Sequence, residues 1–149
     1  EAWQDDLPEG VRFERVPVAF SQAWSEYQRA YYAARELDIL ENNHARLFDA
    51  IHRTQLDLRS REALAQFFAG HGTDAETFRR EMSSPVVRRA VVEADRRTRE
   101  DEIRAVPTVV VDGRYRISGG ELSRRQILGV AEELIARELA ARGGTDDAG

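Results

Sequence analysis

A long helical stretch with β-type patterns on both sides limits how this chain can fold. Residues 21–101 place apolar side chains at helical spacing and show no strand pattern over about 80 positions. Before this stretch, apolar and polar residues mostly alternate over residues 11–18, which predicts a strand. After it, residues 107–118 contain a β-branched run, Asp112-Gly113 and a second alternating run, which together predict a β-hairpin. The predicted order is strand, about five helices, hairpin and a final helix.

Capping residues predict where the helices begin. Ser60 and Ser84 are predicted N-caps, and Pro85 takes the first helical position, where its missing N–H costs nothing. Thr73 and Glu76 have the spacing of a capping box, which predicts that Thr73 opens a short helix. Apolar residues at helical spacing predict the buried faces. These residues are Trp24, Tyr27, Tyr31, Ala34, Leu37, Leu47, Phe48, Ile51, Val86, Val87, Ala90, Val91, Ala94, Ile127, Leu128, Ala131, Leu134, Ile135 and Leu139.

Composition and charge exclude several classes of protein. Hydrophobic residues make up 42% of the 149 residues and charged residues 33%, which is ordinary for a globular domain. The 22 basic and 27 acidic residues give a net charge of −5, which argues against a nucleic-acid-binding protein. No apolar run approaches the roughly 18 residues that a membrane span needs. The chain contains no cysteine, so it has no disulfide, no thiolate metal site and no cysteine nucleophile of its own.

The other residue types that carry chemistry form no recognisable site. His44, His52 and His71 lack the spacing of a metal-binding motif. No nucleophile-elbow pattern singles out a serine, and Gly119-Gly120 lacks the rest of a phosphate-binding loop. A pair of carboxylates for acid–base catalysis stays open, although nothing singles one out. The sequence therefore predicts no metal and no cofactor.

The entry to the predicted hairpin carries the most specific pattern in the chain. From the residues alone, Pro107 reads as a proline that opens a buried strand in the ordinary trans form. However, Val106-Pro107-Thr108, the β-branched run, the Asp-Gly turn and the closing helix resemble the C-terminal half of a thioredoxin-like domain. In that fold the proline is cis and lies beside the redox-active cysteine pair.

Three upstream segments narrow the resemblance to the DsbA family of bacterial periplasmic thiol:disulfide oxidoreductases. They are Leu7-Pro8-Glu9-Gly10-Val11, Val16-Pro17-Val18-Ala19-Phe20 and Leu47-Phe48-Asp49-Ala50-Ile51-His52. With the length of the helical block, the resemblance covers residues 1 to about 142. It implies an α/β chain with a thioredoxin-like fold and a helical insertion.

The resemblance also implies a division of the chain. Residues 1–20 are expected to supply the end of the first helix and one strand of the thioredoxin-like domain. Residues 21–84 form the expected helical insertion, and residues 85–142 the long helix, the hairpin and the final helix. A disordered tail is expected over residues 143–149.

The chain departs from the family at the redox site. Family members begin with a strand and a Cys-x-x-Cys pair at the start of the first helix, where the helix dipole and backbone donors stabilise the reactive thiolate. These residues contain neither the cysteines nor that strand nor the start of that helix, so we expect the chain by itself to be inactive. We expect an N-terminal segment or a second chain to take the place of the strand, between residues 11–20 and the hairpin, where two valine-rich edges otherwise stay unpaired.

The part of the family's site that can be transferred is Val106, Pro107 and Thr108. The resemblance assigns these residues to substrate binding, with a cis bond between Val106 and Pro107, and the residue before the proline offers its backbone to an extended peptide. The implied activity is the introduction of disulfides into unfolded secreted proteins through mixed disulfides. The implied partners are extended or unfolded polypeptides and a membrane reoxidase, and the implied location is the periplasm.

Two other interpretations remain open at this point. One is a relative of kappa-class glutathione transferases or isomerases, which also combine a thioredoxin core with a helical insertion. The segments at residues 7–10 and 47–51 favour the DsbA family over this class. The other is a thioredoxin-like domain that naturally lacks cysteine and binds peptides through the groove beside Pro107.

Overall fold

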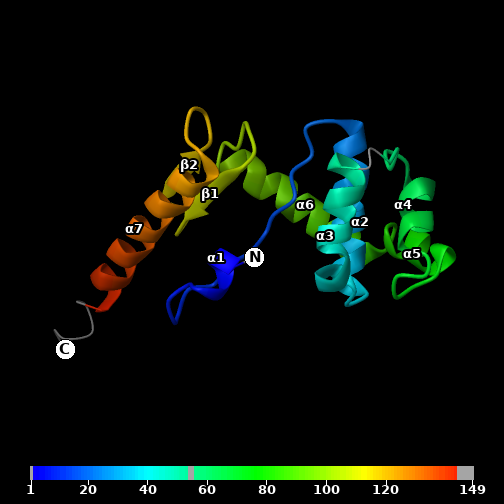
Figure 1. Ribbon diagram of the computed structural model, residues 1–149, viewed down its shortest axis with the longest axis horizontal. Helices are drawn as coiled ribbons and strands as arrows, with labels where there is room; N and C mark the ends of the chain where they lie inside the picture. The colour runs from blue at the N-terminus through cyan, green and yellow to red at the C-terminus, as the bar shows by residue number, and fades with distance from the viewer. Residues whose placement is uncertain (1, 54–55, 144–149) are drawn as a thin grey trace. The chain divides into compact units, whose positions relative to one another are not determined.

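The computed structural model describes residues 2–53 and 56–143 of the chain (Figure 1). Contacts between residues divide it into two compact units. Residues 1–14 and 98–149 belong to the first, which we call the terminal unit, and residues 15–97 form the second, which we call the helical unit. Most of the predicted disordered tail, residues 143–149, lies outside the described residues, because only Gly143 at the end of the last helix is described.

The terminal unit is built on an antiparallel hairpin. Strand β1 (Thr108–Val111) pairs with strand β2 (Tyr115–Ser118), so that Thr108 lies opposite Ser118 and Val111 opposite Tyr115. This confirms the predicted hairpin, although its loop contains three residues because Arg114 belongs to it. The loop has positive φ angles at Asp112 (54°) and Gly113 (65°), which these residue types tolerate better than most.

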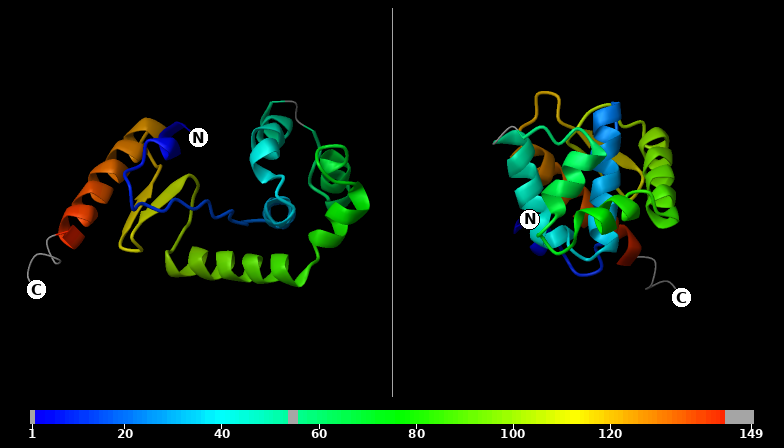
Figure 2. Two further views of the ribbon diagram at one scale, coloured as in Figure 1. Left: turned by 90° about the horizontal axis from the view of Figure 1, so that it is seen from below. Right: turned by 90° about the vertical axis from the view of Figure 1, so that its right-hand side faces the viewer.

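Helix α7 (Arg124–Gly143) covers one side of this hairpin (Figure 2). Its start is fixed by a capping box, in which the Ser123 hydroxyl accepts from the Gln126 N–H (3.3 Å) and the Gln126 side chain accepts from the Ser123 N–H (2.9 Å). The predicted apolar face of α7 is confirmed in the first half of the helix, where Ile127 and Ala131 are buried in the same cluster as Val111 and Ile117 of the hairpin. The short helix α1 (Ala2–Asp5) adds Trp3 to the same core.

Polar contacts tie the far end of α7 to the hairpin. The carboxylate of Glu138, which is only 9% exposed, accepts hydrogen bonds from the Tyr115 hydroxyl (3.0 Å) and from Arg114 (3.0 Å). Arg142 pairs with Asp112 in the hairpin loop. Because a buried carboxylate is stable only when it is paired, these contacts allow Glu138 to lie within the apolar core.

The helical unit consists of short helices and most of one longer helix. These are α2 (Gln22–Glu36), α3 (Leu40–His52), α4 (Arg61–Phe68), α5 (Ala75–Glu81) and α6 (Pro85–Glu100), whose last residues belong to the terminal unit. The predicted caps at Ser60 and Ser84 are confirmed, since their hydroxyls accept from the N–H groups of Ala63 and Val87, each at 3.1 Å.

The prediction that Thr73 caps α5 is wrong by one residue. The carboxylate of Asp74 accepts from the Thr77 N–H at 2.8 Å, so Asp74 is the N-cap. Thr73 instead forms an isolated bridge with Ala69, which holds its backbone outside the helix. Asp is among the best N-cap residues, and here it competes successfully with the threonine that precedes it.

Part of the predicted core of the helical unit is wrong. Trp24, Phe48 and Val86 are exposed, although they share helical stripes with buried residues. A helix buries only the side that meets a neighbour, and the buried face of α2 is centred on small residues that let other helices approach. The side chain of Ile51 lies outside the described residues. The observed core is Ala30, Tyr32, Ala33, Ala34, Ile39, Leu40, Ala50, Leu58, Leu64, Ala65, Phe68, Phe78, Met82, Val87, Val91 and Ala94.

The strand predicted over residues 11–18 is also wrong. The segment has no ladder partner, since the only strands in the described part of the chain, β1 and β2, pair with each other. Side chains of α2 hold part of it instead: Gln28 donates to the Pro17 carbonyl (3.0 Å) and the Tyr31 hydroxyl donates to the Arg15 carbonyl (3.5 Å). An alternating pattern makes a segment suitable for a strand, but a strand exists only where another backbone pairs with it.

The described residues contain neither a candidate membrane span nor a candidate metal site. Among the helices that the structure describes, none combines the length and the apolar character that crossing a membrane requires. The same residues contain no group of three or more histidine, aspartate or glutamate side chains placed to hold a metal ion.

Candidate functional site

The segment that joins α6 to β1 is anchored to β2 by one arginine. The Arg116 side chain donates to the carbonyls of Asp101 (2.7 Å) and Glu102 (3.2 Å), and it forms an ion pair with the Glu102 carboxylate (3.1 Å). Glu102 has a φ of 49°, which ends α6 in a left-handed turn. Arg116 thereby fixes the direction in which the chain leaves α6 and enters the next loop.

The next loop presents Val106 and Pro107 on the surface. Their peptide bond is cis, as the family resemblance implies. The Val106 side chain is 50% exposed and Pro107 is also exposed. Thr108 turns its hydroxyl toward the protein, where it donates to the Ala105 carbonyl (2.7 Å) and lies 3.3 Å from the Ser118 hydroxyl. The side chain of Thr108 therefore closes the loop.

The backbone of Val106 is available for binding. Within the ranges that the structure describes, its N–H and its carbonyl have no hydrogen-bond partner. Backbone groups in a folded protein are normally paired, either within the protein or with water. An exposed apolar side chain with an unpaired N–H and carbonyl is what an extended peptide needs for β-type pairing.

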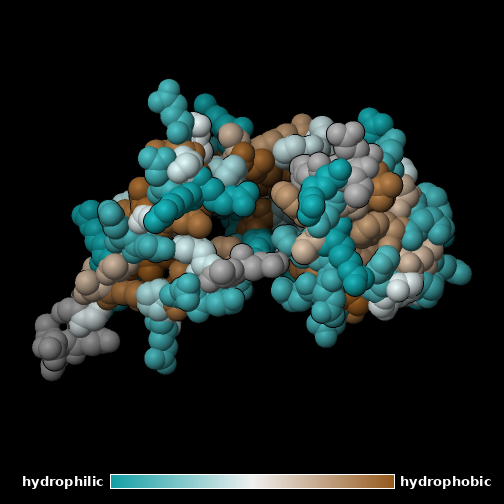
Figure 3. All heavy atoms as spheres, viewed as in Figure 1, coloured by the Kyte–Doolittle hydropathy of each residue, from teal (hydrophilic) through white to brown (hydrophobic). Residues whose placement is uncertain are grey.

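A second loop, which follows β2, lies next to Pro107. A Cβ atom on Gly119 would lie 3.8 Å from the Pro107 carbonyl oxygen and 3.8 Å from Cδ1 of Ile127, so this position lies between the first loop and α7. The Leu122 N–H donates to the Gly119 carbonyl (2.7 Å), and the Leu122 side chain is 41% exposed. Hydrophobic side chains are visible on the surfaces of both units (Figure 3), and Val106 and Leu122 are the exposed ones on these two loops.

Comparison with known protein families shows to which family this chain is related. The family model described as the DSBA-like thioredoxin domain matches residues 1–126. The chain belongs to this family. The expected thioredoxin-like fold with a helical insertion is confirmed, and so is the expectation that this DsbA-like chain lacks the family's redox cysteines.

Curated relatives and solved structures agree with this assignment. The thiol:disulfide interchange protein DsbA of Azotobacter vinelandii is 33% identical over 142 residues, which are 95% of this chain and 66% of that protein. DsbA of Pseudomonas aeruginosa is 30% identical over 140 residues, again with 66% of its length covered. The chain thus spans just under two thirds of the length of these relatives.

The crystal structure of DsbA from Xylella fastidiosa superimposes with a TM-score of 0.85 at 30% identity and covers 93% of this chain and 75% of that one. The crystal structure of DsbA from P. aeruginosa also gives 0.85, at 29% identity.

The three residues predicted from sequence are contiguous, with Val106 and Pro107 in the loop and Thr108 at the start of β1, but their neighbours were missed. Arg116 and the loop around Gly119 and Leu122 come from a later part of the chain, which the strand pairing brings beside the start of β1. Gly119-Gly120 after an alternating strand was the signal that could have pointed to the second loop. Among the histidines considered for a metal site, His44 and His71 lie in the helical unit, and the side chain of His52 lies outside the described residues.

Proposed function

We propose that this chain provides the peptide-binding side of a DsbA-type thiol:disulfide interchange site. Val106, Pro107 and Thr108 hold an extended polypeptide, while a cysteine pair outside these 149 residues exchanges disulfides with it. In that exchange, two substrate thiols become a disulfide and the disulfide of the cysteine pair becomes two thiols. The observation that carries the proposal is the unpaired backbone of Val106 on an exposed loop.

The division of roles inside the loop supports peptide binding. The side chains of Thr108 and Arg116 donate hydrogen bonds to carbonyls of the protein, and these bonds fix the loop. The backbone of Val106 is then the group left to meet a ligand. Main-chain pairing tolerates many side chains, and this tolerance suits unfolded polypeptides of varied sequence.

The place for the cysteine pair is the open edge of the hairpin. Strand β1 pairs only with β2 in the described part of the chain, so its other edge can accept a further strand. Placing the cysteine-bearing polypeptide on this edge completes a thioredoxin-like sheet beside the Val106 loop. The matching proposals for partners and location are unfolded secreted polypeptides, a membrane reoxidase and the periplasm, which follow from the family.

Peptide binding is tested with a probe that contains no cysteine. The acetylated and amidated peptide QQVSVQQ is titrated into ¹⁵N-labelled chain, and we expect the amide signals of Val106 and Thr108 to shift. A peptide N-methylated at the central serine lacks one backbone donor and should bind about fivefold more weakly, the effect of roughly one hydrogen bond. Shifts confined to other residues, or equal affinity of the two peptides, would overturn the proposal.

A thiol count separates the enzymatic proposal from a purely binding role. The native protein is isolated with its associated polypeptides, and its thiols are counted under reducing and denaturing conditions together with an intact mass. Two thiols in the peptide-binding species support disulfide exchange. A thiol-free species that still binds QQVSVQQ refutes the exchange and leaves the chain as a peptide-binding domain of thioredoxin-like fold.

A further inference from the structure

We infer that the Val106 loop has a basic rim, formed by Arg104, Arg124 and Arg125, that selects extended peptides with acidic residues beside an apolar one. The inference deepens the proposed function and rests on it, because it concerns the ligand of the same loop. The rim belongs entirely to the terminal unit.

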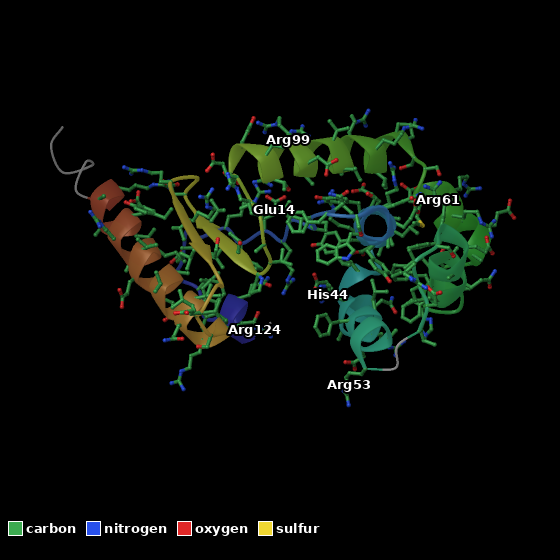
Figure 4. The ribbon with its side chains drawn as sticks, turned by 90° about the horizontal axis from the view of Figure 1, so that it is seen from above. Glu14, His44, Arg53, Arg61, Arg99 and Arg124 are labelled. Carbon is green, nitrogen blue, oxygen red and sulfur yellow. The ribbon has the colours of Figure 1, made fainter. Side chains whose placement is uncertain are left out.

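The three arginines flank the two loops in sequence. Arg104 lies two residues before Val106, and Arg124 and Arg125 open α7 directly after the loop that borders Pro107. Figure 4 shows Arg124 at the start of α7. All three are exposed, and no ion pair or hydrogen bond of their side chains is found within the described residues. Their charges therefore remain available to a ligand.

The local charge has the opposite sign to the charge of the whole chain. Residues 101–108 and 119–126, together with Arg116, contain four arginines and three acidic residues, Asp101, Glu102 and Glu121, which gives a net charge of +1. The chain as a whole has a net charge of −5. An excess of positive charge around one exposed apolar loop of an acidic protein favours a negatively charged partner at that loop.

The position of Arg124 and Arg125 does not serve the stability of α7. The start of a helix carries a partial positive charge, so acidic residues stabilise the first turn and basic residues oppose it. The first turn of α7 contains no acidic residue. The helix dipole and the two guanidinium groups instead add their potentials at the end of α7 that borders the Val106 loop.

The apolar residues of the two loops define the centre of the expected ligand. Val106 and Leu122 are half-exposed and can pack against one or two apolar side chains of a peptide. Flanking acidic residues of an extended peptide then reach the arginines, since alternate side chains along a strand point to the same side. The expected ligand is an extended segment with a small apolar centre and acidic flanks.

The test compares three peptides that differ only in charge. Acetylated and amidated EEVSVEE, QQVSVQQ and KKVSVKK are titrated into the full chain at low salt, with affinity measured by calorimetry and the binding site by NMR. We expect EEVSVEE to bind about fivefold more tightly than QQVSVQQ, and KKVSVKK to bind more weakly, as for a few exposed charge pairs. The preference should fall below about twofold in roughly 0.5 M NaCl.

Matched variants assign the preference to the rim. The double variant Arg124→Gln/Arg125→Gln and the single variant Arg104→Gln should each reduce the ratio of EEVSVEE to QQVSVQQ affinity without changing the affinity for QQVSVQQ. Arg137→Gln is the control, because Arg137 is exposed on α7 about 18 Å further along the helix. Equal binding of the three peptides at the Val106 loop would overturn the rim and leave the proposed function intact. Binding of none of them would overturn the proposed function itself.

Discussion

Gln28 connects the segment before α2 to the core of the helical unit, and its replacement by methionine should destabilise that unit. The side chain is 1% exposed and donates through Nε2 to the Pro17 carbonyl and to the Asp95 carboxylate, each at 3.0 Å. Gln28→Met keeps nearly the same volume, so the cavity effect is small. The change therefore removes two hydrogen bonds from an otherwise unaltered core.

The magnitude follows from the two acceptors. A bond to a neutral carbonyl contributes about 1 kcal/mol net, and a bond to a charged carboxylate about 1.5–3 kcal/mol. Asp95 is only partly buried, so water can replace part of the second bond, and the low end applies. We expect the free energy of unfolding of the helical unit to fall by about 2.5 kcal/mol, roughly a 70-fold change in the folding equilibrium.

Urea unfolding followed by tryptophan fluorescence measures this change. A Trp3→Phe background leaves Trp24 as the only tryptophan, so that the signal reports on the helical unit. Gln66→Met is the matched control, because Gln66 is exposed and donates only to Glu62 on the surface of α4 (3.0 Å). A loss below about 0.5 kcal/mol for Gln28→Met, or an equal loss for both variants, would refute the assigned role.

Three further predictions concern separate parts of the chain. Hydrogen bonds from the side chain and backbone of Arg59 lower the pKa of Asp57 from 3.8 to about 2. The ionised Asp57 carboxylate therefore contributes stability above pH 4, and this contribution is lost as the pH falls through about 2. Arg59→Ala should return the NMR titration midpoint of Asp57 toward 3.8, and an unchanged midpoint would contradict this cause. Phe78→Ala should cost about 3–5 kcal/mol in urea unfolding, because Phe78 is fully buried and stacks on Phe68 at 4.2 Å; a loss near 1 kcal/mol would show that the core closes over the cavity. Ser123→Ala should destabilise the terminal unit by about 1 kcal/mol, measured through Trp3 fluorescence in a Trp24→Phe background, and an unchanged midpoint would argue against the capping box.

Local signals account for the elements that the sequence predicted well. The hairpin depends on an Asp-Gly turn between two β-branched or alternating runs, although its register is set by a three-residue loop that also includes Arg114. The caps at Ser60 and Ser84 need only a hydroxyl and an N–H group three residues later. Such features are formed within a few residues, so no knowledge of the rest of the fold is needed to predict them.

The errors in predicting strands and buried residues arise where contacts with a second part of the chain determine the structure. Residues 11–18 have a strand pattern, but within the described residues no strand pairs with them, and Phe48 lies on an apolar stripe but is 52% exposed. The burial of Gln28 was not predicted, because it depends on contacts with distant parts of the chain. Nothing in the local sequence distinguishes a buried glutamine from an exposed one, because its acceptors at Pro17 and Asp95 come from distant positions.

The candidate site depends partly on a local sequence pattern and partly on contacts with a distant segment. For this reason the sequence predicted only part of it. Val106, Pro107 and Thr108 are contiguous and carry a family pattern, so the sequence alone predicts them. The groups that make the loop a binding surface are supplied by register: β2 brings Arg116 to the end of α6 and Ser118 to Thr108.

Fixing a loop through its side chains while leaving one backbone unit unpaired has a consequence for specificity. In the proposed function, main-chain hydrogen bonds at Val106 accept nearly any extended sequence, and they provide affinity without discrimination. Discrimination must then come from the surroundings, and exposed charges are suited to this because each contributes little and acts over several ångströms. On this reasoning the Val106 loop determines that an extended chain binds, and the arginines around it shift the choice among such chains by a few-fold. For a protein that acts on many unfolded sequences, we expect the backbone contacts to supply most of the affinity and the charges to supply only a small preference among sequences.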